Sequence, residues 1–359
     1  MHLETYAYAH ILGGLFGQAL GDAWAMPALL RPVQTWEYYN GWLGELLPAP
    51  PDHPVHAGLK AGQVTDDTQQ AIALARAIVV DGQITVEGAA KAIVAWYDQL
   101  DGDNVQFVGP STRRAVMALK AGDDPNLTGL RGDTNGGAMR ICPIGLIHPG
   151  QPEAAVQDAV TACTPTHFTD VAVSGACAVA AAIARAMTPD TTLEHIIDIA
   201  IWGADIGLRH GSPWMGASIA RKIDYAVQLA SDVSVPERDR IQNLYDLVGS
   251  TLATADAVPC AFGILTMAGG NPVDTAIYAA ALSGDADTVG AMACAIAGAW
   301  HGIDTIPIEY IELLRQANPE YDFEEIAEDL YDVALENYDA TTTAHLGENL
   351  LENLFGQGE

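Results

Sequence analysis

Apolar residues recur along almost the whole chain at the three- and four-residue spacing of amphipathic helices, and the alternating pattern of strands is scarce. The predicted helices span approximately residues 7–24, 66–80, 85–99, 111–121, 153–162, 169–187, 192–204, 214–230, 236–253, 259–268, 273–282, 288–300 and 323–336. The segments between them are rich in Gly, Pro, Asp and Asn, which is typical of turns. The pattern therefore predicts an all-α fold of helices packed orthogonally in a compact domain.

The chain shows no repeat and no Ser- or Pro-rich linker long enough to separate domains. A Pro-rich loop at 48–62 is short and ends at an acidic cluster, so it is expected to serve a site. We predict one domain over residues 1–359, with an acidic helical extension over 308–359. From Glu309 onward, fourteen acidic residues face one basic residue, Arg315.

Composition narrows the classes of partner. The chain is 49% apolar but only 7% aromatic, so its core is expected to consist of small residues that let helices approach closely. Its net charge of −30 repels nucleic acid, whose binding proteins depend on Lys and Arg. We therefore expect no nucleic acid partner.

Nothing in the sequence indicates export or a membrane. The five cysteines are widely spread and lie mostly among apolar residues, which favours buried thiols over disulfides or a zinc site. The N-terminus lacks the pattern of a signal peptide. The longest weakly apolar run, 171–187, contains Ser174 and Arg185 and is too short and polar for a transmembrane helix. The expected location is the cytoplasm.

Two acidic clusters carry the strongest chemical signal. Thr65, Asp66, Asp67 and Thr68 precede one apolar helix, and the cluster of Asp285, Asp287 and Thr288 precedes another. Either cluster alone is more simply explained as a helix N-cap. If the clusters meet, four carboxylates in a half-buried cleft repel one another unless cations neutralise them. Oxygen ligands favour Mg²⁺ or Mn²⁺, so the sharper hypothesis is a cleft with two metal ions.

Five segments together resemble the ADP-ribosylglycohydrolase family, which also includes the J1 crystallins. They are GLFGQALGDAWAMP (14–27), TDDT (65–68), NGGAMRICPIGL (135–146), THFTDVAVSGA (166–176) and GDADTVGAMACAIAGAWHGIDTIP (284–307). The resemblance covers about residues 9–307, with the segments in the family's order. It implies an all-helical glycosidic-bond hydrolase.

The resemblance also implies roles for the acidic clusters. Thr65, Asp66 and Asp67 match the first set of metal ligands, and Asp285, Asp287 and Thr288 match the second. Two Mg²⁺ or Mn²⁺ ions would hold the ribose hydroxyls and a water near the anomeric carbon, with Asp67 or Asp285 holding or deprotonating that water. The implied substrate is a small ribosyl or ADP-ribosyl molecule or an ADP-ribosylated protein. Leu29 stands where the family commonly has a glutamate.

Further residues are candidates for substrate binding: Asp22, Asn135, Gly136, Gly137, Met139, His167 and Trp214. Asp133 is a candidate catalytic helper. Each has an ordinary alternative, such as a paired helix-interior Asp22, a plain turn at Asn135–Gly137, or a core Trp214. Arg140 either binds an anion or tethers its loop through buried hydrogen bonds. Ser212 and Pro213 suggest an N-cap and first helical turn.

Two other classes compete with the hydrolase. A non-catalytic crystallin-like scaffold of the same fold would not need four mutually repelling acids, and a two-metal phosphoesterase does not match the motif order. The sequence contains no Walker loop, G-x-S-x-G, H-E-x-x-H or C-x-x-C motif, which argues against nucleotide-driven, triad-based and zinc-based chemistry.

Overall fold

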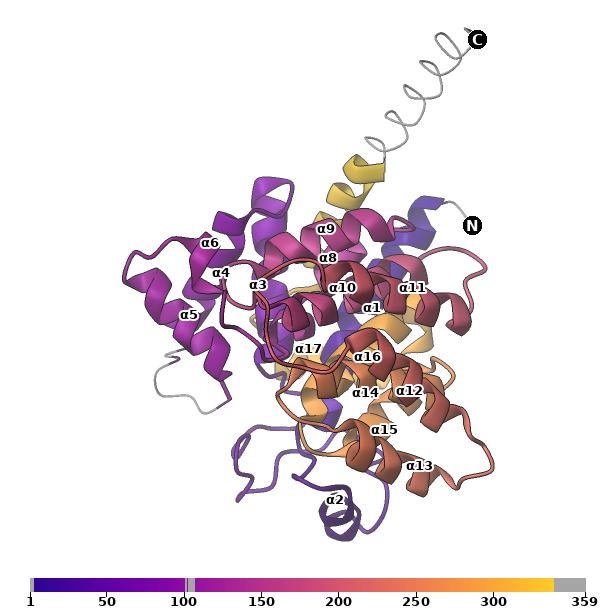
Figure 1. Ribbon diagram of the computed structural model, residues 1–359. Coiled ribbons are helices and arrows are strands. Elements are labelled where there is room, and N and C mark those ends of the chain that lie inside the picture. The colour runs from indigo at the N-terminus through magenta and orange to yellow at the C-terminus, as the bar shows by residue number, and fades with distance from the viewer. Residues whose placement is uncertain (1–2, 101, 103–106, 339–359) are drawn as a thin grey trace, which may run out of the picture.

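The structure, a computed structural model, describes residues 3–100, 102 and 107–338, and within them it contains helices and no strand. The longer helices are α1 (Leu3–Ala25), α3 (Asp66–Asp81), α4 (Val86–Gln99), α5 (Pro110–Lys120), α9 (Pro152–Cys163), α10 (Asp170–Ala186), α11 (Leu193–Gly207), α12 (Ile219–Ser231), α14 (Thr254–Met267), α15 (Pro272–Leu282), α16 (Ala286–His301), α17 (Ile308–Ala317) and a helix at 323–338. The shorter elements are α2 (Pro32–Tyr38), α6 (Pro125–Thr128), α7 (Gly136–Met139), α8 (Cys142–Leu146), α13 (Glu237–Asn243), the π-helix η1 (Leu244–Val248) and the 3₁₀-helix η2 (Ile303–Thr305). The prediction of an all-α fold is confirmed (Figure 1).

Helices α1 and α16 pack against each other with their backbones in contact. A Cβ atom on Gly17 would lie 2.2 Å from the carbonyl oxygen of Cys294, and one on Gly21 would lie 2.0 Å from that of Gly290. Only glycine fits at such distances, which explains why these helices are built from small residues. The contact fixes the end of α1 beside the start of α16, where acidic residues of both helices lie.

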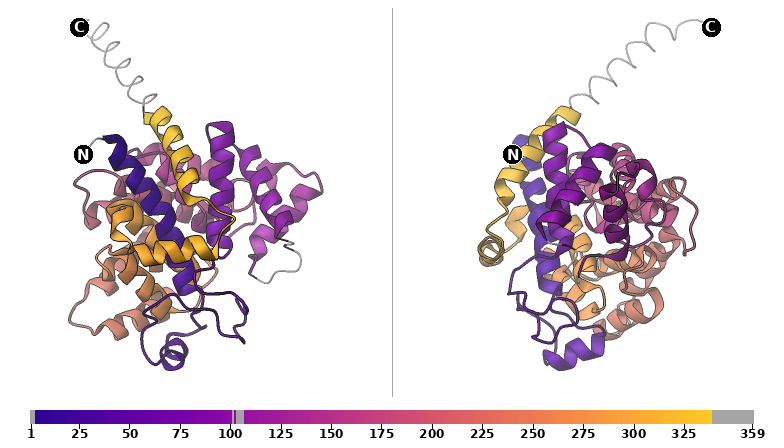
Figure 2. Two further views of the ribbon diagram at one scale, coloured as in Figure 1. Left: turned by 180° about the vertical axis from the view of Figure 1, so that it is seen from behind. Right: turned by 90° about the vertical axis from the view of Figure 1, so that its left-hand side faces the viewer.

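One apolar core extends from α1 to the helix at 323–338, and a smaller cluster joins α4 to α5. Figure 2 shows α17 and the helix at 323–338 lying against α1, and the rings of Phe16 and Phe323 are 4.8 Å apart. The first part of the predicted acidic extension is therefore helical and packed on the core. Residues 339–359 lie outside the described residues.

Several predicted boundaries are wrong. The helix predicted from 214 begins at Ile219, with Ser218 as its N-cap instead of Ser212. The backbone of Ser212 instead exchanges hydrogen bonds with Phe168 and Asp170, which holds this segment outside the helix. The segment predicted as one helix at 236–253 forms α13 followed by η1. The helical run ends at Val248 because Gly249 has a φ of 101°.

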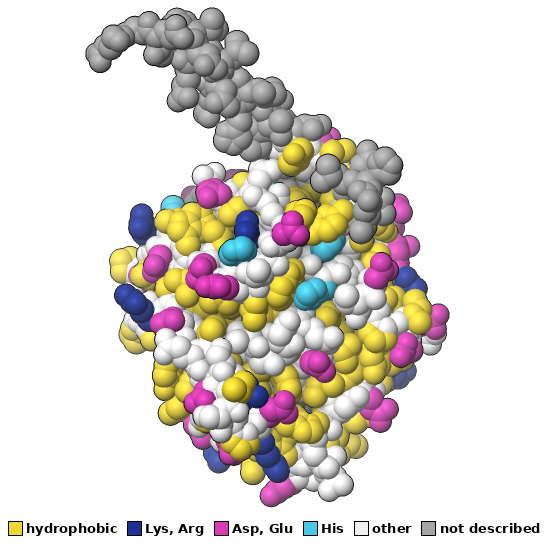
Figure 3. Space-filling model, turned by 90° about the vertical axis from the view of Figure 1, so that its right-hand side faces the viewer, with side chains coloured by type: hydrophobic (Ala, Val, Ile, Leu, Met, Phe, Trp, Pro, Cys, Tyr) yellow, Lys and Arg dark blue, Asp and Glu magenta, His cyan; other side chains and the backbone are white. Residues whose placement is uncertain are grey.

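Short helices were missed. α2 was not predicted, and the single turn α7 follows Asn135 where the sequence suggested a loop. All five cysteines are buried and free, as expected. None of the described helices combines the length and apolar character needed to cross a bilayer. On the face drawn in Figure 3, the described Lys and Arg side chains are scattered and form no basic patch.

Candidate active site

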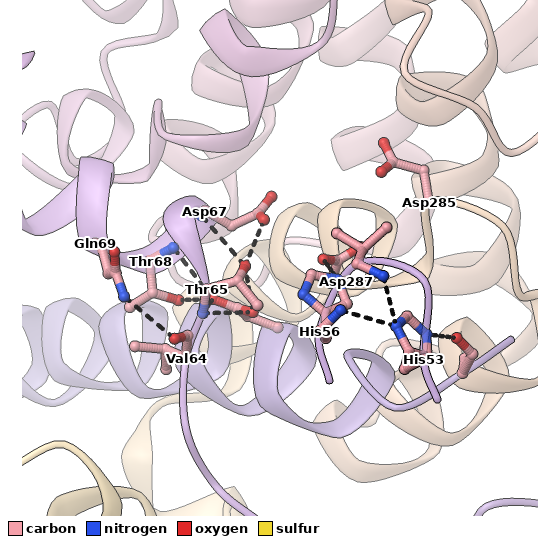
Figure 4. Close-up of polar contacts among 12 residues, drawn as sticks. His53, His56, Val64, Thr65, Asp67, Thr68, Gln69, Asp285 and Asp287 are labelled. Carbon is pink, nitrogen blue, oxygen red and sulfur yellow. Dashed lines mark hydrogen bonds and ion pairs between the residues drawn. The ribbon is translucent and has the colours of Figure 1, made fainter. Parts of the chain in front are cut away.

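Acids of both clusters line one cavity of about 190 Å³, whereas Thr65 and Thr68 do not line it. Asp66 and Asp67 reach it from the start of α3, and Asp285, Asp287 and Thr288 reach it from the start of α16. Asp67 and Asp285 are 218 positions apart in the sequence. The fold therefore brings together the two segments whose joint role was in question. Figure 4 shows the carboxyl groups of Asp67 and Asp285 facing each other across the site.

The first cluster is held by Asp22, which is fully buried on α1. Its carboxyl group accepts hydrogen bonds from the backbone N–H groups of Thr65, at 3.0 Å, and Thr68, at 3.2 Å. It also lies 2.9 Å from the hydroxyl of Thr65 and 2.6 Å from that of Thr68. Asp22 thus joins α1 to the first turn of α3 and fixes the direction of Asp67. It does not line the cavity, so the expectation that it binds substrate is corrected to a supporting position.

Thr65 caps α3 and lies between two acids. Its hydroxyl oxygen is 2.9 Å from Asp22 Oδ1 and 2.8 Å from Asp67 Oδ2. A hydroxyl group carries one hydrogen, so the second contact needs a proton on a carboxyl group. This geometry agrees with acids that retain protons when no cation is bound.

The second cluster is held by the loop before α16. Gly284 has a φ of 74°, and a Cβ there would lie 2.3 Å from the carbonyl oxygen of Ser250, so only glycine fits this turn. Asp285 occupies the N-cap position of α16 without a capping hydrogen bond from its side chain, and its Oδ2 accepts a hydrogen bond from Asn135 Nδ2 at 2.5 Å. Asp287 lies in the first turn, where its Oδ2 is 2.9 Å from His56 Nε2.

Burial dominates the electrostatics of the cluster. Loss of solvent raises the pKa of Asp22 and of Asp285 to about 7, and the nearby charge of Asp287 adds to both increases. The same two causes raise the pKa of Asp66 and Asp67 well above the ordinary value. Burial is the largest single influence on Asp287 and opposes its charge, but the charge and hydrogen bond of His56, together with the nearby backbone, outweigh burial and lower the pKa of Asp287.

His56 shows the matching change. Burial lowers its pKa, but the charge and hydrogen bond of Asp287, together with the charges of Asp22 and Asp66, raise it more, so the net pKa is above the ordinary value. Asp287 and His56 therefore form an ion pair, whereas loss of the proton is unfavourable for Asp22, Asp66, Asp67 and Asp285.

The donor set suits a hard divalent cation. The Oδ1 atom of Asp67 is buried and has no hydrogen-bond partner among the described residues. A carboxylate oxygen left in this way at a cavity wall is available to a cation. Among the described residues no three His, Cys, Asp or Glu side chains already form a closed ligand set. The cavity thus offers acidic oxygens from two sides, and cation binding needs them to draw together.

Three predicted substrate-binding residues line the cavity: Asn135, Gly136 and Met139. Gly137 lies behind them, where a Cβ would lie 3.0 Å from Cys163 Sγ. His167 is fully buried, and a Cβ on Gly136 would lie 2.7 Å from its Nε2. Gly136 therefore separates His167 from the cavity, and the expectation that His167 touches substrate is corrected to a supporting position behind the wall.

Asp133 and Trp214 form a pair beside the cavity and do not line it. The Nε1–H of Trp214 donates to Asp133 Oδ2 at 3.0 Å, and its backbone N–H donates to Asp170 Oδ1. Trp214 is about one-third exposed, so it is not a core residue. In this arrangement neither side chain reaches the acidic floor of the cavity, where Asp133 was expected to act.

Of its two predicted roles, anion binding or tethering of its loop, Arg140 has the second. It is fully buried and donates hydrogen bonds to Gln70 Oε1, at 3.0 Å, and to the hydroxyl of Thr166. Gln70 in turn donates to Asp66 Oδ2 at 3.0 Å. Arg140 therefore tethers its own segment and orients Asp66 through Gln70.

Sequence reasoning missed His53 and His56, which also line the cavity. They lie in the Pro-rich loop at 48–62, which was linked to the site only as a whole. The available signal was two histidines three residues apart, shortly before the first acidic cluster.

Comparison with known sequences shows that the chain belongs to the ADP-ribosylglycohydrolase family, whose sequence profile matches residues 4–340. The predicted class, a glycosidic-bond hydrolase, is confirmed by this membership. A relative is the Escherichia coli (strain K12) protein YegU, itself uncharacterized, which is 34% identical over 298 residues, 82% of this chain and 89% of YegU. Another is the ADP-ribosylarginine hydrolase Tri1 of Pseudomonas putida (strain GB-1), which is 26% identical and aligns over 90% of this chain and 78% of Tri1.

A solved structure shares the fold. It is described as an ADP-ribosylglycohydrolase-related protein complex and superposes with a TM-score of 0.68 over 92% of this chain and 99% of its own. The sequences are 22% identical in this alignment, so the likeness concerns the arrangement of helices.

Proposed function

We propose that this protein uses two divalent cations, Mg²⁺ or Mn²⁺, to hydrolyse the glycosidic bond at the anomeric carbon of a ribose. The observation that carries the proposal is the cavity lined by Asp66, Asp67, Asp285 and Asp287. Two observations support a site completed by cations: the raised pKa values of the acids, and Asp67 Oδ1, which has no hydrogen-bond partner among the described residues.

Each side of the cavity would hold the cations with oxygen atoms. Thr65, Asp66 and Asp67 would supply one side, and Asp285, Asp287 and Thr288 the other. Bound cations would orient the ribose hydroxyls and make a nearby water more acidic. Asp67 or Asp285 would hold that water and take its proton, and the acidic wall would stabilise the positive charge that develops on the sugar as the leaving group departs.

The size and lining of the cavity limit the kinds of substrate that fit it. A cavity of about 190 Å³ is below the roughly 300–1,000 Å³ of pockets that enclose whole drug-sized ligands, so it suits a sugar ring with the rest of the molecule outside. Leu30 and Leu252 line it and are about half exposed, which places apolar surface near the opening. The substrate would be an ADP-ribose conjugate, free or on a protein, or a nucleoside-like ribosyl compound.

The competing function is a scaffold of the same fold without catalysis. The buried acids argue against it, because folding a protein around four carboxyl groups is unfavourable unless they bind something. Leu29 stands at a position where the family commonly has an acid. Because of this departure, the scaffold alternative needs an experimental test.

The deciding experiment is a screen for release of ribose or ADP-ribose from arginine-linked, serine-linked and nucleoside substrates, with Mn²⁺ or with chelator. We expect turnover of at least one substrate, dependent on the cation and reduced by a factor of about 100 or more in Asp67→Asn, because the substitution removes a cation and water ligand. Asp98→Asn changes a half-exposed acid paired with Lys120 and serves as the control. No turnover of any of these substrates by the wild type would favour the scaffold.

A further inference from the structure

The loop at 48–62 is fastened to the site by two histidines. His53 Nε2 donates to the carbonyl oxygen of Ala28 at 2.8 Å, and its Nδ1 accepts the backbone N–H of His56 at 2.9 Å. The two rings stack with centroids 5.1 Å apart. With both nitrogens of His53 engaged, the loop holds the ring of His56 in one place, beside α16.

His56 is buried and points its Nε2 at Asp287, as Figure 4 shows. The contact joins Nε2 to Asp287 Oδ2 at 2.9 Å. The ring's other nitrogen, Nδ1, has no hydrogen-bond partner among the described residues. The contact with Asp287 is thus the polar interaction that the His56 side chain makes within the described part of the chain.

We propose that His56 is a positioning residue, which holds the carboxylate of Asp287 in the orientation that binds a divalent cation. The inference rests on the proposed function, since it concerns the same cations. A carboxylate fixed by a neighbouring donor loses less freedom when it takes up a cation, and such supporting contacts commonly change metal affinity 10–100-fold. Asp287 belongs to the second cluster, so the loop at 48–62 becomes a structural part of the cation site.

The chain contains a matched control. His148 is also buried, its Nε2 lies 2.7 Å from Asp158 Oδ2, and its Nδ1 likewise has no partner among the described residues. The His148–Asp158 pair does not line the cavity. Replacing either histidine breaks the same kind of pair, but only His56 touches a residue of the acidic clusters.

The test is direct binding of Mn²⁺, without substrate, by isothermal titration calorimetry and by the electron paramagnetic resonance signal of free Mn²⁺. We expect His56→Phe to weaken at least one Mn²⁺ site by about 10–100-fold. His56→Gln, whose amide can still donate to Asp287, restores the affinity, and His148→Phe keeps it. Thermal unfolding in chelator shows whether each variant folds. If His56→Phe does not fold, the Mn²⁺ affinities of His56→Gln and of the shorter His56→Asn are compared instead.

The outcomes separate the two proposals. If the wild type binds Mn²⁺ and His56→Phe and His56→Asn bind it equally well, the role of His56 is wrong and the proposed cation site stands. If His148→Phe weakens binding as much as His56→Phe, the effect is one of general stability and the inference fails. If the wild type binds no Mn²⁺, both proposals fail together.

Discussion

At the scale of the residue, the site holds acids in surroundings that oppose their charge. Asp67 is 1% exposed, and burial and neighbouring acids raise its pKa far above the ordinary value. Thr65 and Asp22 position it but bring no positive charge. Such an arrangement is unfavourable alone and becomes favourable when a cation joins the acids.

Replacing Asp67 by Asn is expected to stabilise the cation-free protein. The amide keeps an acceptor for Thr65 and removes the ionisable group, so the free energy of unfolding in chelator at pH 8 should rise by about 1–3 kcal/mol. The same variant should lose the increase in melting temperature that Mn²⁺ gives the wild type. Chemical denaturation and thermal unfolding, each with and without Mn²⁺, measure both effects. A variant less stable than the wild type in chelator contradicts this view of Asp67.

At the scale of the element, the site depends on how closely α1 and α16 approach. Asp22 lies near the end of α1, and Asp285 and Asp287 at the start of α16, so the Gly-mediated contact between these helices sets the distance between them. A helix pair held apart by even one methyl group would move the second cluster relative to the first.

Gly17→Ala tests this contact. The added Cβ would meet the carbonyl oxygen of Cys294 at 2.2 Å, a backbone atom that cannot rotate away, so the helices must separate. We expect the free energy of unfolding to fall by about 1–3 kcal/mol and Mn²⁺ affinity to fall with it. Gly44→Ala, where a Cβ meets no atom within 4 Å, is the control for chemical denaturation. Equal stability of the two variants would show that the helices are not so tightly packed.

The helices themselves were largely predictable, because their apolar spacing is regular and their N-caps are typical. The start of α3 at the Thr65 cap is an example. The start of α12 was not predictable, since Ser212 and Pro213 form a good local cap that long-range bonds to Phe168 and Asp170 override. The acidic clusters could be found from composition and order, whereas the pairing of His56 with Asp287 depends on how a long loop folds back.

At the scale of the whole molecule, acidic residues are in excess over the whole chain and are also concentrated in the cavity. The net charge of −30 raises the concentration of cations around the protein, and the cavity concentrates acids from two distant segments. One core connects α1, α3 and α16, and the loop at 48–62 is joined to them by the contacts of His53 with Ala28 and of His56 with Asp287.

The stability of the cation-free protein is expected to fall as pH rises from about 5 to 8. Asp22 and Asp285 have folded-state pKa values of about 7, above those of the unfolded chain, so the folded state holds more protons in this range. The raised pKa of His56 also makes the stability fall as the pH rises above the ordinary pKa of histidine. Thermal unfolding in chelator across this range measures the effect, and Mn²⁺ should offset it most at high pH. Constant or rising stability in chelator would contradict the pKa changes.

The most direct test of the two-cation cavity is an anomalous difference map from crystals grown with Mn²⁺. The account predicts two peaks about 3.5–4 Å apart in the cavity. One would be bound by Asp66 and Asp67 and the other by Asp285 and Asp287, and the second peak would be weakened in Asp285→Asn. A map with no peak among these four acids, at Mn²⁺ concentrations above which the melting temperature rises no further, would contradict the two-cation cavity.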